Sequence, residues 1–345
     1  MPTHRVLYLL GPEHVELRRE PIPRPAAGEV LLRLDAATTC GTDLKVFKRG
    51  GHPTMLSTPC PFGHEMTGTL AAIGAGTPNW REGDAVVVAN SASCGQCRFC
   101  RAGRENLCVN LLYLNGAFAE YLLVPEDFVR HSTYRRPDGL KPALAAMTEP
   151  LACVFHGLSA CCLDDVTECI ILGAGPIGLM FVAELAHRGI RVILGDLTPQ
   201  RLEVGQLLGA SDTVLVSGDR TDGDTLRAAT EYDRGAQLVI EATGFPTAWS
   251  NSMEAVAPGG EVILFGGCTP GTTAELDTHR LHYSEITVKG VYHHRPATVQ
   301  AALDRLTEGT LPLEHLLQER CDLDGIEGAL GRMASRKILK AVVTT

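Results

Sequence analysis

Short apolar runs rich in branched side chains alternate with turn residues over the first third of the chain. The segments 21–29 and 74–84 are rich in Pro, Gly and charged residues, so they read as turns. The apolar runs around them read as strands at 30–34, 67–74, 84–89 and 119–125. We therefore expect a small, irregular and mostly antiparallel β domain in this part of the chain.

The pattern changes near Ala143, where helical apolar spacing begins and runs over residues 145–161. Residues 169–196 then read as a strand, a Gly-rich turn, a helix and a second strand. Strands that alternate with helices predict parallel βαβ units with right-handed crossovers. An amphipathic helix at 297–309 and a strand-like run at 338–345 follow, and we expect this tail to rejoin the first domain. The intervening elements are a helix at 200–210 and strands at 212–217, 237–244, 261–267 and 286–292.

The composition is that of an ordinary globular protein with two domains, because 345 residues contain 45% hydrophobic and 21% charged side chains. The net charge of −9 argues against a nucleic-acid partner and against an anionic membrane surface, both of which require a basic face. No apolar stretch approaches the ~20 residues that span a bilayer. The N-terminus shows no signal-peptide pattern, so we expect a cytoplasmic protein with reduced thiols.

Four of the twelve cysteines form a C-x2-C-x2-C-x7-C cluster made of Cys94, Cys97, Cys100 and Cys108. Four thiolates at this spacing can close a tetrahedral shell around one Zn²⁺ and leave no position for a substrate. The cluster therefore predicts a structural zinc site. Six other cysteines read as small buried apolar residues: Cys153, Cys161, Cys162, Cys169, Cys268 and Cys321.

A dinucleotide fingerprint, G-x-G-x-x-G, directly follows the apolar strand at 169–172. The first glycine allows a tight turn, the second lets a pyrophosphate approach the backbone, and the third lets the helix pack on the strand. The helix N-terminus then offers free N–H groups to the phosphates. The motif and its inner residues are Gly173, Gly175, Pro176, Ile177 and Gly178.

Three further features extend the predicted cofactor site. Asp196 ends the next strand, 18 residues after Gly178, where a carboxylate binds ribose hydroxyls and repels a 2′-phosphate, so NAD is favoured over NADP. Arg201 either flanks the adenine or pairs with Asp196, which leaves NADP open. Two residue pairs at strand ends contact the ligand or form simple turns: Thr243–Gly244 and Gly266–Gly267.

A second set of metal-ligand residues, Cys40, His64, Glu65 and Glu149, is scattered along the chain. Thiolate, imidazole and carboxylate all bind zinc, and three protein ligands plus an open position make a catalytic site. Each residue alone also has an ordinary structural interpretation, such as a buried thiol, a core histidine or a carboxylate at a helix start.

The order of these motifs decides between the interpretations. CGTD at 40–43, GHE at 63–65, the cysteine cluster, EPLACV at 149–154 and GAGPIG at 173–178 follow one another as in the zinc-containing medium-chain alcohol dehydrogenases. The sequence resembles that family over nearly its whole length, and it is most similar to the branch of sorbitol (L-iditol) and threonine dehydrogenases. In that branch, Glu-Pro-Leu replaces a cysteine ligand of the liver-type enzymes.

The resemblance implies an α/β fold with a Rossmann doubly wound parallel sheet and a GroES-like, mostly-β catalytic domain that carries a structural-zinc lobe. The catalytic domain would span 1–150 with the lobe at about 90–112, the NAD-binding domain 151–292, and the tail 293–345 would return to the catalytic domain. Two zinc ions per chain are implied. The catalytic ion would bind Cys40, His64 and either Glu65 or Glu149.

The resemblance also implies oxidation of a secondary alcohol by hydride transfer to the nicotinamide, with Thr42 passing the alcohol proton outward. The chain departs from relatives at two pocket positions. Lys45 replaces a histidine proton relay, and Val46 replaces the tyrosine of sorbitol dehydrogenases. Threonine dehydrogenases carry a histidine upstream of the cysteine cluster, which this chain lacks. Further candidate substrate contacts are Tyr113, His293 and Arg295.

We expect a small-molecule alcohol as substrate, with a polyol as the first hypothesis and L-threonine or another amino alcohol as the alternative. The acidic net charge and the dinucleotide fingerprint argue against a zinc-ribbon nucleic-acid binder. The full set of predicted catalytic-zinc ligands argues against a non-catalytic binding protein. The strands at 261–267 and 286–292 would lie near a sheet edge, and relatives are dimers or tetramers, so we expect a homo-oligomer.

Overall fold

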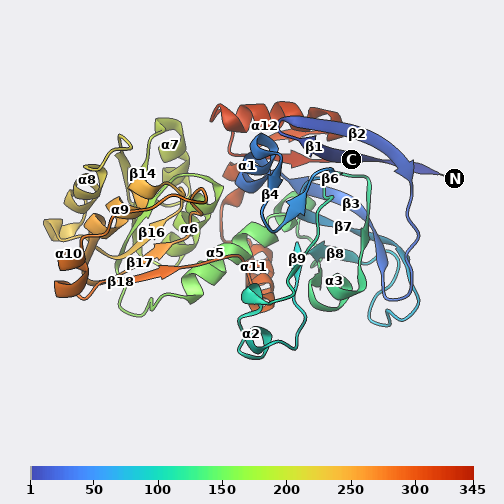
Figure 1. Cartoon of the computed structure of the whole chain (residues 1–345), viewed down its shortest axis with the longest axis horizontal. Coiled ribbons are helices and arrows are strands. Elements are labelled where there is room, and N and C mark those ends of the chain that lie inside the picture. Colours follow the sequence, from blue (N-terminus) through green and yellow to red (C-terminus); the bar gives the residue numbers. More distant parts are fainter. Residues whose placement is uncertain (1) are drawn as a thin grey trace. The chain divides into compact units, whose positions relative to one another are not determined.

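The computed structural model describes residues 2–345, which divide into two compact units (Figure 1). The first unit contains the described residues up to Ala152, together with His294–Glu308 and Leu317–Thr345. The second contains Cys153–His293 and the short segment Gly309–Leu316. That short segment lies in the tail that we expected to return to the first domain as a whole. The chain passes from the first unit to the second within helix α5 (Thr148–Ser159).

The first unit is built mainly from antiparallel strands. Its largest sheet has the order β12-β8-β7-β3-β20-β19, and β11 also pairs with β3. A second sheet has the order β2-β1-β6, and two strand pairs are β10-β9 and β4-β5. Only β19 and β20 pair in parallel among these strands of the described chain. The strands are β1 (Thr3–Gly11), β2 (His14–Pro21), β3 (Val30–Thr38), β4 (Gly51–His52), β5 (Leu56–Ser57), β6 (Cys60–Pro61), β7 (Glu65–Ile73), β8 (Ala85–Val88), β9 (Ser91–Ala92), β10 (Leu112–Tyr113), β11 (Tyr121–Val124), β12 (Thr133–Arg135), β19 (Leu317–Cys321) and β20 (Lys340–Val343).

Short helices connect these strands. Helix α1 begins with a capping box, because the Cys40 side chain accepts from the backbone while the Asp43 side chain accepts from Cys40 N. It ends at Gly50, whose φ of 74° is the left-handed conformation typical of glycine at helix ends. The helices are α1 (Gly41–Arg49), α2 (Arg98–Arg101), α3 (Glu126–His131), α4 (Pro142–Ala145), α11 (Pro296–Glu308) and α12 (Ile326–Ala334), with 3₁₀ turns η1 (Glu105–Leu107) and η4 (Leu323–Gly325).

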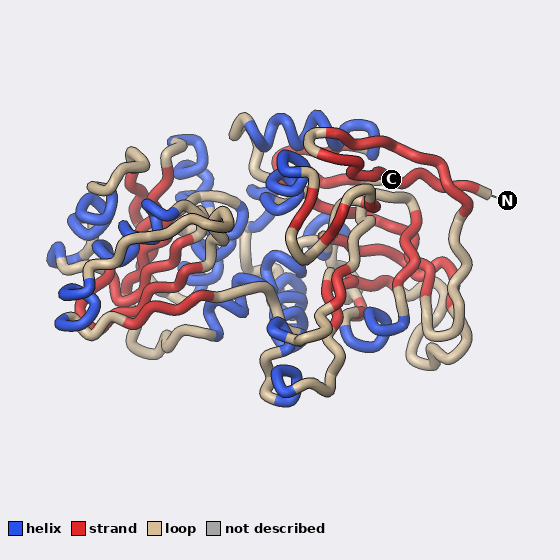
Figure 2. Tube along the Cα trace, in the orientation of Figure 1, coloured by secondary structure: helices blue, strands red, loops and turns tan. Residues whose placement is uncertain are grey.

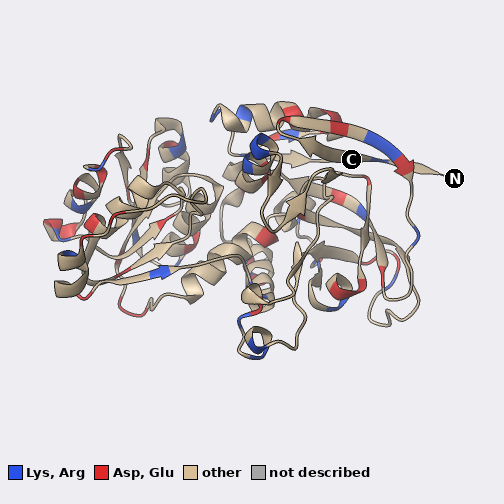
Figure 3. Ribbon diagram, viewed as in Figure 1, with Lys and Arg blue, Asp and Glu red and all other residues tan. Residues whose placement is uncertain are grey.

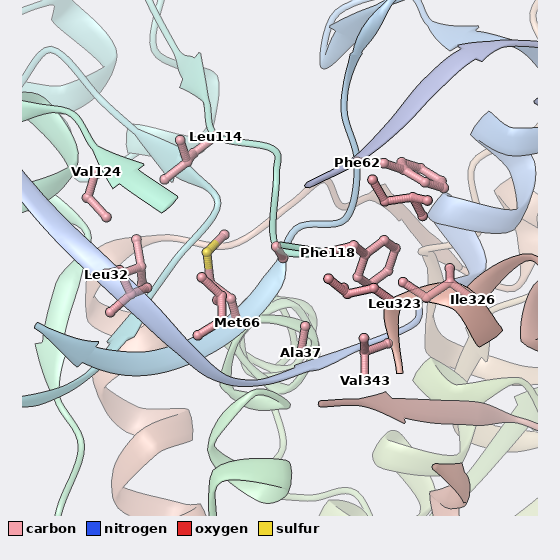
Figure 4. Packing of buried hydrophobic residues seen from close by; sticks show 14 of the residues in the cluster. Leu32, Ala37, Phe62, Met66, Leu114, Phe118, Val124, Leu323, Ile326 and Val343 are labelled. Carbon is pink, nitrogen blue, oxygen red and sulfur yellow. The ribbon is translucent and has the colours of Figure 1, made fainter. Parts of the chain in front are cut away.

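The core of the first unit brings together side chains from distant parts of the chain (Figure 4). Leu32 of β3, Met66 of β7 and Val343 of β20 are each buried there. The rings of Phe62 and Phe118 meet edge to face at 5.5 Å. The last strand is therefore held in the same core as the strands that carry the candidate ligands.

The second unit contains one parallel sheet with the order β15-β14-β13-β16-β17-β18, and helices (blue in Figure 2) surround its strands. All five residues of β13 are buried, as expected for a parallel strand covered on both faces. The order reverses between β13 and β16, which are therefore the strands at the switch point of the sheet. The strands are β13 (Glu168–Leu172), β14 (Arg191–Asp196), β15 (Asp212–Leu215), β16 (Ala236–Glu241), β17 (Val256–Leu264) and β18 (Thr287–Gly290).

The helices of the second unit follow the expected alternation with strands. Strand β18 lies at the sheet edge and β17 lies beside it, as the sequence predicted. The helices are α6 (Pro176–His187), α7 (Pro199–Leu207), α8 (Asp222–Ala228), α9 (Pro246–Ala255) and α10 (Thr278–Tyr283), with 3₁₀ turns η2 (Glu231–Asp233) and η3 (Leu313–Leu316).

One prediction about the cysteines was wrong. Cys153 and Cys169 are buried, but Cys161, Cys268 and Cys321 are only partly buried and Cys162 is exposed. These positions lie near the ends of elements, where a small side chain stays in contact with solvent. Among residues 2–345, no helix has both the length and the apolar character needed to cross a bilayer.

Candidate functional site

The four cysteines of the predicted structural site converge in the first unit. Their ligand atoms all lie within 4.8 Å of one another. The Sγ atoms of Cys97 and Cys100 are 3.5 Å apart, and those of Cys94 and Cys108 are 3.4 Å apart. Thiolates on one tetrahedral zinc ion stand about 3.8 Å apart, which follows from a Zn–S distance of about 2.3 Å. The cluster therefore fits a closed zinc site.

Local structure explains how these thiols converge. Cys97 immediately precedes α2, which carries Cys100, and the backbone N–H of Cys94 donates to Cys108 Sγ at 3.3 Å. Backbone N–H groups of Cys100 and Val109 lower the pKa of Cys97 to about 6, whereas burial raises the pKa of Cys100 to about 12. The backbone is thus arranged to stabilise negative charge on part of the cluster before any metal binds.

The second group joins Cys40, His64 and Glu65, whose ligand atoms also lie within 4.8 Å of one another. Cys40 precedes α1, His64 precedes β7, and Glu65 is the first residue of β7. Strand β7 pairs with β3, so the end of β3 at Thr38 brings Cys40 beside His64 and Glu65. Thiolate, imidazole and carboxylate groups that meet in this way fit a zinc ion.

Asp43 orients this group, although the sequence analysis did not name it as a site residue. Its Oδ1 lies 2.9 Å from His64 Nδ1, and its Oδ2 accepts from Cys40 N at 2.9 Å. The contact at Nδ1 leaves Nε2 of His64 for a metal, which is the usual carboxylate–histidine arrangement at zinc sites. The signal was present in CGTD, where Asp43 stands at the third position of the helix after Cys40.

The electrostatics of His64 follow from these contacts. Burial by itself lowers the pKa of His64, but the carboxylate of Asp43 and the thiol of Cys40 raise it well above its usual value. In the metal-free protein, a proton on His64 is therefore favoured. A metal ion would have to displace that proton. The group thus holds a proton in the metal-free protein and would hold a metal ion in its place.

Glu65 is paired with Lys340 of β20, and both side chains are fully buried. Lys340 Nζ donates to Glu65 Oε2 at 2.6 Å and to Thr39 O at 2.6 Å, and the Thr38 hydroxyl also donates to Glu65 Oε2. Burial by itself lowers the pKa of Lys340, and the charge of Glu65 raises it above its usual value. Lys340 was not predicted from the sequence, although a lysine inside the apolar run ILKAVV was a signal.

The structure places Glu149 outside the group of Cys40, His64 and Glu65. Glu149 is buried near the start of α5, and its Oε1 lies 3.8 Å from His294 Nε2. That nitrogen lies 3.0 Å from Asn90 Oδ1. Asn90 was not predicted from the sequence as a site residue.

The remaining pocket candidates lie in varied surroundings. Val46 is 2% exposed and belongs to the hydrophobic core, so this prediction of a substrate contact is not supported by its packing. Lys45 is exposed on α1, where Figure 3 shows further basic residues. Tyr113 is half-buried in β10, and Arg295 donates to Gly103 O at 3.0 Å. His293 belongs to the second unit and has a φ of 63°.

The glycine turn of the second unit has the geometry that a dinucleotide requires. A Cβ on Gly178 would lie 1.8 Å from Gly173 O, whereas a Cβ on Gly175 would have nothing within 4 Å. The third glycine is thus required by packing, and the second leaves its backbone open. Pro176 stands at the first position of α6 and Ile177 follows it. The turn fits a pyrophosphate at a helix N-terminus.

Asp196 and the Thr243–Gly244 pair lie beside this turn. Asp196 ends β14, where its Oδ2 accepts from Ala174 N at 2.7 Å and its Oδ1 accepts from Thr198 N at 2.8 Å. Arg201 follows in α7. The Thr243–Gly244 turn packs against Gly267 and against Gly173. The sheet thus gathers the predicted glycines at the carboxyl ends of β13, β16 and β17.

Comparisons with known proteins agree with this geometry. The alcohol dehydrogenase GroES-like domain matches residues 26–133, and the zinc-binding dehydrogenase family matches residues 176–308. The chain is 28% identical to L-threonine 3-dehydrogenase of Aeromonas hydrophila subsp. hydrophila, and the match covers 94% of each chain. It is 28% identical to sorbitol dehydrogenase of Bacillus subtilis, over 92% of this chain and 90% of that protein.

A solved zinc-binding dehydrogenase of Sinorhizobium meliloti 1021, bound to NADP, is 27% identical and superposes with a TM-score of 0.90 over 100% of both chains. The two family matches together cover most of the sequence, and they include the cysteine cluster, the open-site group and most of the parallel sheet. The chain therefore belongs to the zinc-containing medium-chain dehydrogenase family and is a zinc-dependent alcohol dehydrogenase.

Proposed function

We propose that this enzyme oxidises a secondary alcohol of a polyol-like substrate to the ketone, with NAD as the hydride acceptor. The observation that carries the proposal is the meeting of Cys40, His64 and Glu65 within 4.8 Å, with Asp43 against the ring of His64. These residues come from separate segments, and their donor atoms suit zinc and an open position.

The roles of the residues follow from their chemistry. Cys40 and His64 would hold the catalytic zinc, with Glu65 or Glu149 as the third protein ligand. A zinc ion held there supplies Lewis-acid polarisation of the alcohol hydroxyl, and a bound nicotinamide cofactor accepts the hydride. Thr42 stands two residues after Cys40 at the start of α1, where its hydroxyl would take the alcohol proton outward. Cys94, Cys97, Cys100 and Cys108 would hold the structural zinc.

The preference for NAD rests on Asp196. Its carboxylate stands at the end of β14 beside the glycine turn, where it can accept hydrogen bonds from ribose hydroxyls. A negative charge at this place disfavours a 2′-phosphate. The Sinorhizobium relative carries NADP, so the two cofactors must be compared directly. A lower KM for NAD than for NADP, reversed or equalised in Asp196→Ser, would support the assignment.

Metal analysis tests the catalytic site. The wild-type chain should contain two zinc ions, and Cys40→Ser should contain one. The activity of Cys40→Ser should fall by about three orders of magnitude, because several kcal/mol of Lewis-acid stabilisation are lost. Cys162→Ser is the matched control, because Cys162 is exposed and lies in neither cluster. Two zinc ions in Cys40→Ser would overturn the assignment.

An L-threonine 3-dehydrogenase is the second candidate, because relatives of that name match as well as the sorbitol dehydrogenase does. Neither substrate has its own pocket residue here, because VVVANSAS lacks the histidine of threonine dehydrogenases and Val46 replaces the tyrosine of sorbitol dehydrogenases. The polyol remains the first hypothesis. The kcat/KM values for L-iditol, sorbitol, cyclitols and L-threonine with NAD would separate the two. A preference for L-threonine would replace the polyol assignment.

We also propose a homodimer or homotetramer. Strand β18 is an edge strand, and its main-chain groups can pair with those of a second copy. Sedimentation equilibrium should give a mass of two or four chains, and a mass of one chain would contradict this.

A further inference from the structure

A buried carboxylate lies at the switch point of the parallel sheet. Glu241 is the last residue of β16 and is fully buried. Its Oε1 accepts from Thr243 N at 2.7 Å, from Gly244 N at 2.9 Å and from the Thr243 hydroxyl. Three donors on one oxygen fix the turn that follows the strand, because hydrogen bonds to a charged acceptor are stronger than neutral ones.

This turn has no room to move toward its neighbours. A Cβ on Gly173 would lie 2.7 Å from Thr243 Cγ2, and a Cβ on Gly244 would lie 2.5 Å from Gly267 O. Gly244 also has a φ of 77°, which other residues rarely adopt. The turn held by Glu241 therefore packs directly against the glycine turn after β13 and the one after β17.

The second oxygen of Glu241 makes this arrangement costly for the fold. Glu241 Oε2 is buried without a hydrogen-bond partner among residues 2–345, and burial raises the pKa of Glu241. A Cβ on Gly266 would lie 2.6 Å from that oxygen, so no side chain fits there. The hydrogen bonds from Thr243 and Gly244 and the indole of Trp249 oppose this effect of burial and favour the ionised carboxylate. The hydrogen bond of the Trp249 indole N–H goes to Gly266 O at 3.1 Å.

A buried oxygen without a partner destabilises a fold, so its retention at one place points to a function there. The place is the carboxyl end of β16, beside β13, where the strand order reverses. Ligands of open α/β sheets bind at this position. The same edge carries the glycine turn that fits a pyrophosphate.

We propose that Glu241 is a positioning residue for the dinucleotide: its carboxylate holds the Thr243–Gly244 turn in the form that contacts the bound cofactor. The inference rests on the proposed NAD site and adds a residue to it. Glu241 does not touch the ligand, because its side chain is sealed behind the turn. Because the carboxylate positions a turn that contacts the cofactor, removal of its charge should weaken cofactor binding more than it lowers the stability of the fold.

The test measures NADH binding by fluorescence in the absence of alcohol. Glu241→Gln preserves the shape of the side chain and removes its charge. We expect its Kd for NADH to rise about tenfold, as when hydrogen bonds to a charged group are weakened. Zinc content should stay at the wild-type value, because the metal groups belong to the other unit. The shift should appear in KM for NAD more than in kcat.

Asp222→Asn is the matched control within the same unit. Asp222 is also buried and also fixes a turn, because its Oδ1 accepts from Ser217 N at 2.9 Å and its Oδ2 accepts from Gly218 N at 2.8 Å. That turn follows β15 at the far edge of the sheet, away from the switch point. Asp222→Asn should lower the unfolding temperature as much as Glu241→Gln does and leave the Kd for NADH unchanged.

Equal NADH binding by Glu241→Gln and wild type would overturn the inference, and so would equal weakening in Asp222→Asn. If Glu241→Gln fails to fold, Thr243→Val decides, because it removes the hydroxyl that donates to Glu241 and accepts from Phe245 N at 3.2 Å, and keeps the two backbone bonds to Glu241. A rise of about threefold in its Kd supports the inference, and an unchanged Kd overturns it. Failure of the wild-type protein to bind either NADH or NADPH would instead overturn the proposed function.

Discussion

Lys340 Nζ lies 2.6 Å from Oε2 and 2.9 Å from Oε1 of Glu65, and neither side chain is exposed to solvent. The two residues are 275 positions apart. Glu65 stands next to the candidate ligand His64, so the pair ties the last strand of the chain to the candidate metal site. The carboxylate of Glu65 is the main group that favours the charged form of Lys340, and Cys40 and Asp43 add to it.

Breaking this pair should destabilise the first unit. Lys340→Met leaves the Glu65 carboxylate buried and uncompensated, which should cost about 3–5 kcal/mol in the free energy of unfolding. Urea denaturation followed by circular dichroism measures this loss. The double variant Lys340→Met/Glu65→Gln should recover most of it, because the buried charge is gone. A double variant as unstable as Lys340→Met would show that packing, rather than charge, accounts for the loss.

Asp43→Asn should weaken zinc binding at the second group without removing a ligand. The amide cannot hold the His64 ring as the carboxylate does across 2.9 Å. Loss of such an orienting partner costs about 10- to 100-fold in metal affinity. Competition with a chromogenic chelator measures the affinity, and the four-cysteine site of the same protein is the internal control. Unchanged affinity would exclude an orienting role for Asp43.

The zinc affinity of this group should also depend on pH with a known sign. The pKa of His64 in the metal-free protein lies well above its usual value, with burial opposing and Asp43 favouring the protonated ring. Zinc requires the neutral ring, so binding releases a proton and the affinity should rise with pH up to the pKa of His64. Titrations at several pH values measure the slope. A zinc affinity that stays constant between pH 6 and pH 8 would contradict this prediction, because His64 would then hold no proton over that range. An unperturbed histidine titrates near pH ~6.5.

The strands, the glycine turn and the cysteine cluster were predictable because their signals are local. Gly173, Gly175 and Gly178 stand within one turn, and the apolar run before them forms a buried strand. The cysteines converge because their spacing matches a short loop and the single turn of α2. In each case a few consecutive residues determine the geometry.

The residues that support the site were not predictable, because their partners lie far away in sequence. Lys340 and Glu65 meet only when β20 pairs with β3 and β3 pairs with β7. His294 and Asn90 are 204 positions apart. Val46 was predicted as a pocket residue from the family resemblance, and long-range packing that the sequence does not reveal places its side chain in the hydrophobic core.

The thiols of the cysteine cluster should react unequally once zinc is removed. Backbone N–H groups lower the pKa of Cys97 to about 6, and burial raises the pKa of Cys100 to about 12. Because the thiolate is the nucleophile, iodoacetamide should label Cys97 of the metal-free protein with a midpoint near pH ~6 and leave Cys100 unlabelled at pH ~8. Peptide mass mapping reads the sites. Zinc should protect both cysteines, and equal labelling of the two would contradict the prediction.

Two glycines of the same turn should respond to alanine in opposite ways. A Cβ on Gly178 would lie 1.8 Å from Gly173 O, which is backbone and cannot move without opening the turn. Gly178→Ala should therefore lower the unfolding temperature and with it NADH binding. A Cβ on Gly175 meets nothing within 4 Å, and its φ of −75° suits alanine. Gly175→Ala should keep the unfolding temperature of the wild type.

NADH binding by Gly175→Ala is then the decisive measurement. If the pyrophosphate approaches the backbone at this glycine, the added methyl group should raise the Kd for NADH by about tenfold or more, because the loss of close contacts to the phosphates has no compensation. Thermal unfolding and fluorescence titration of the same sample separate the two effects. Wild-type binding by Gly175→Ala would mean that the open space above this backbone serves another ligand or none, since nothing in the fold itself requires a glycine there.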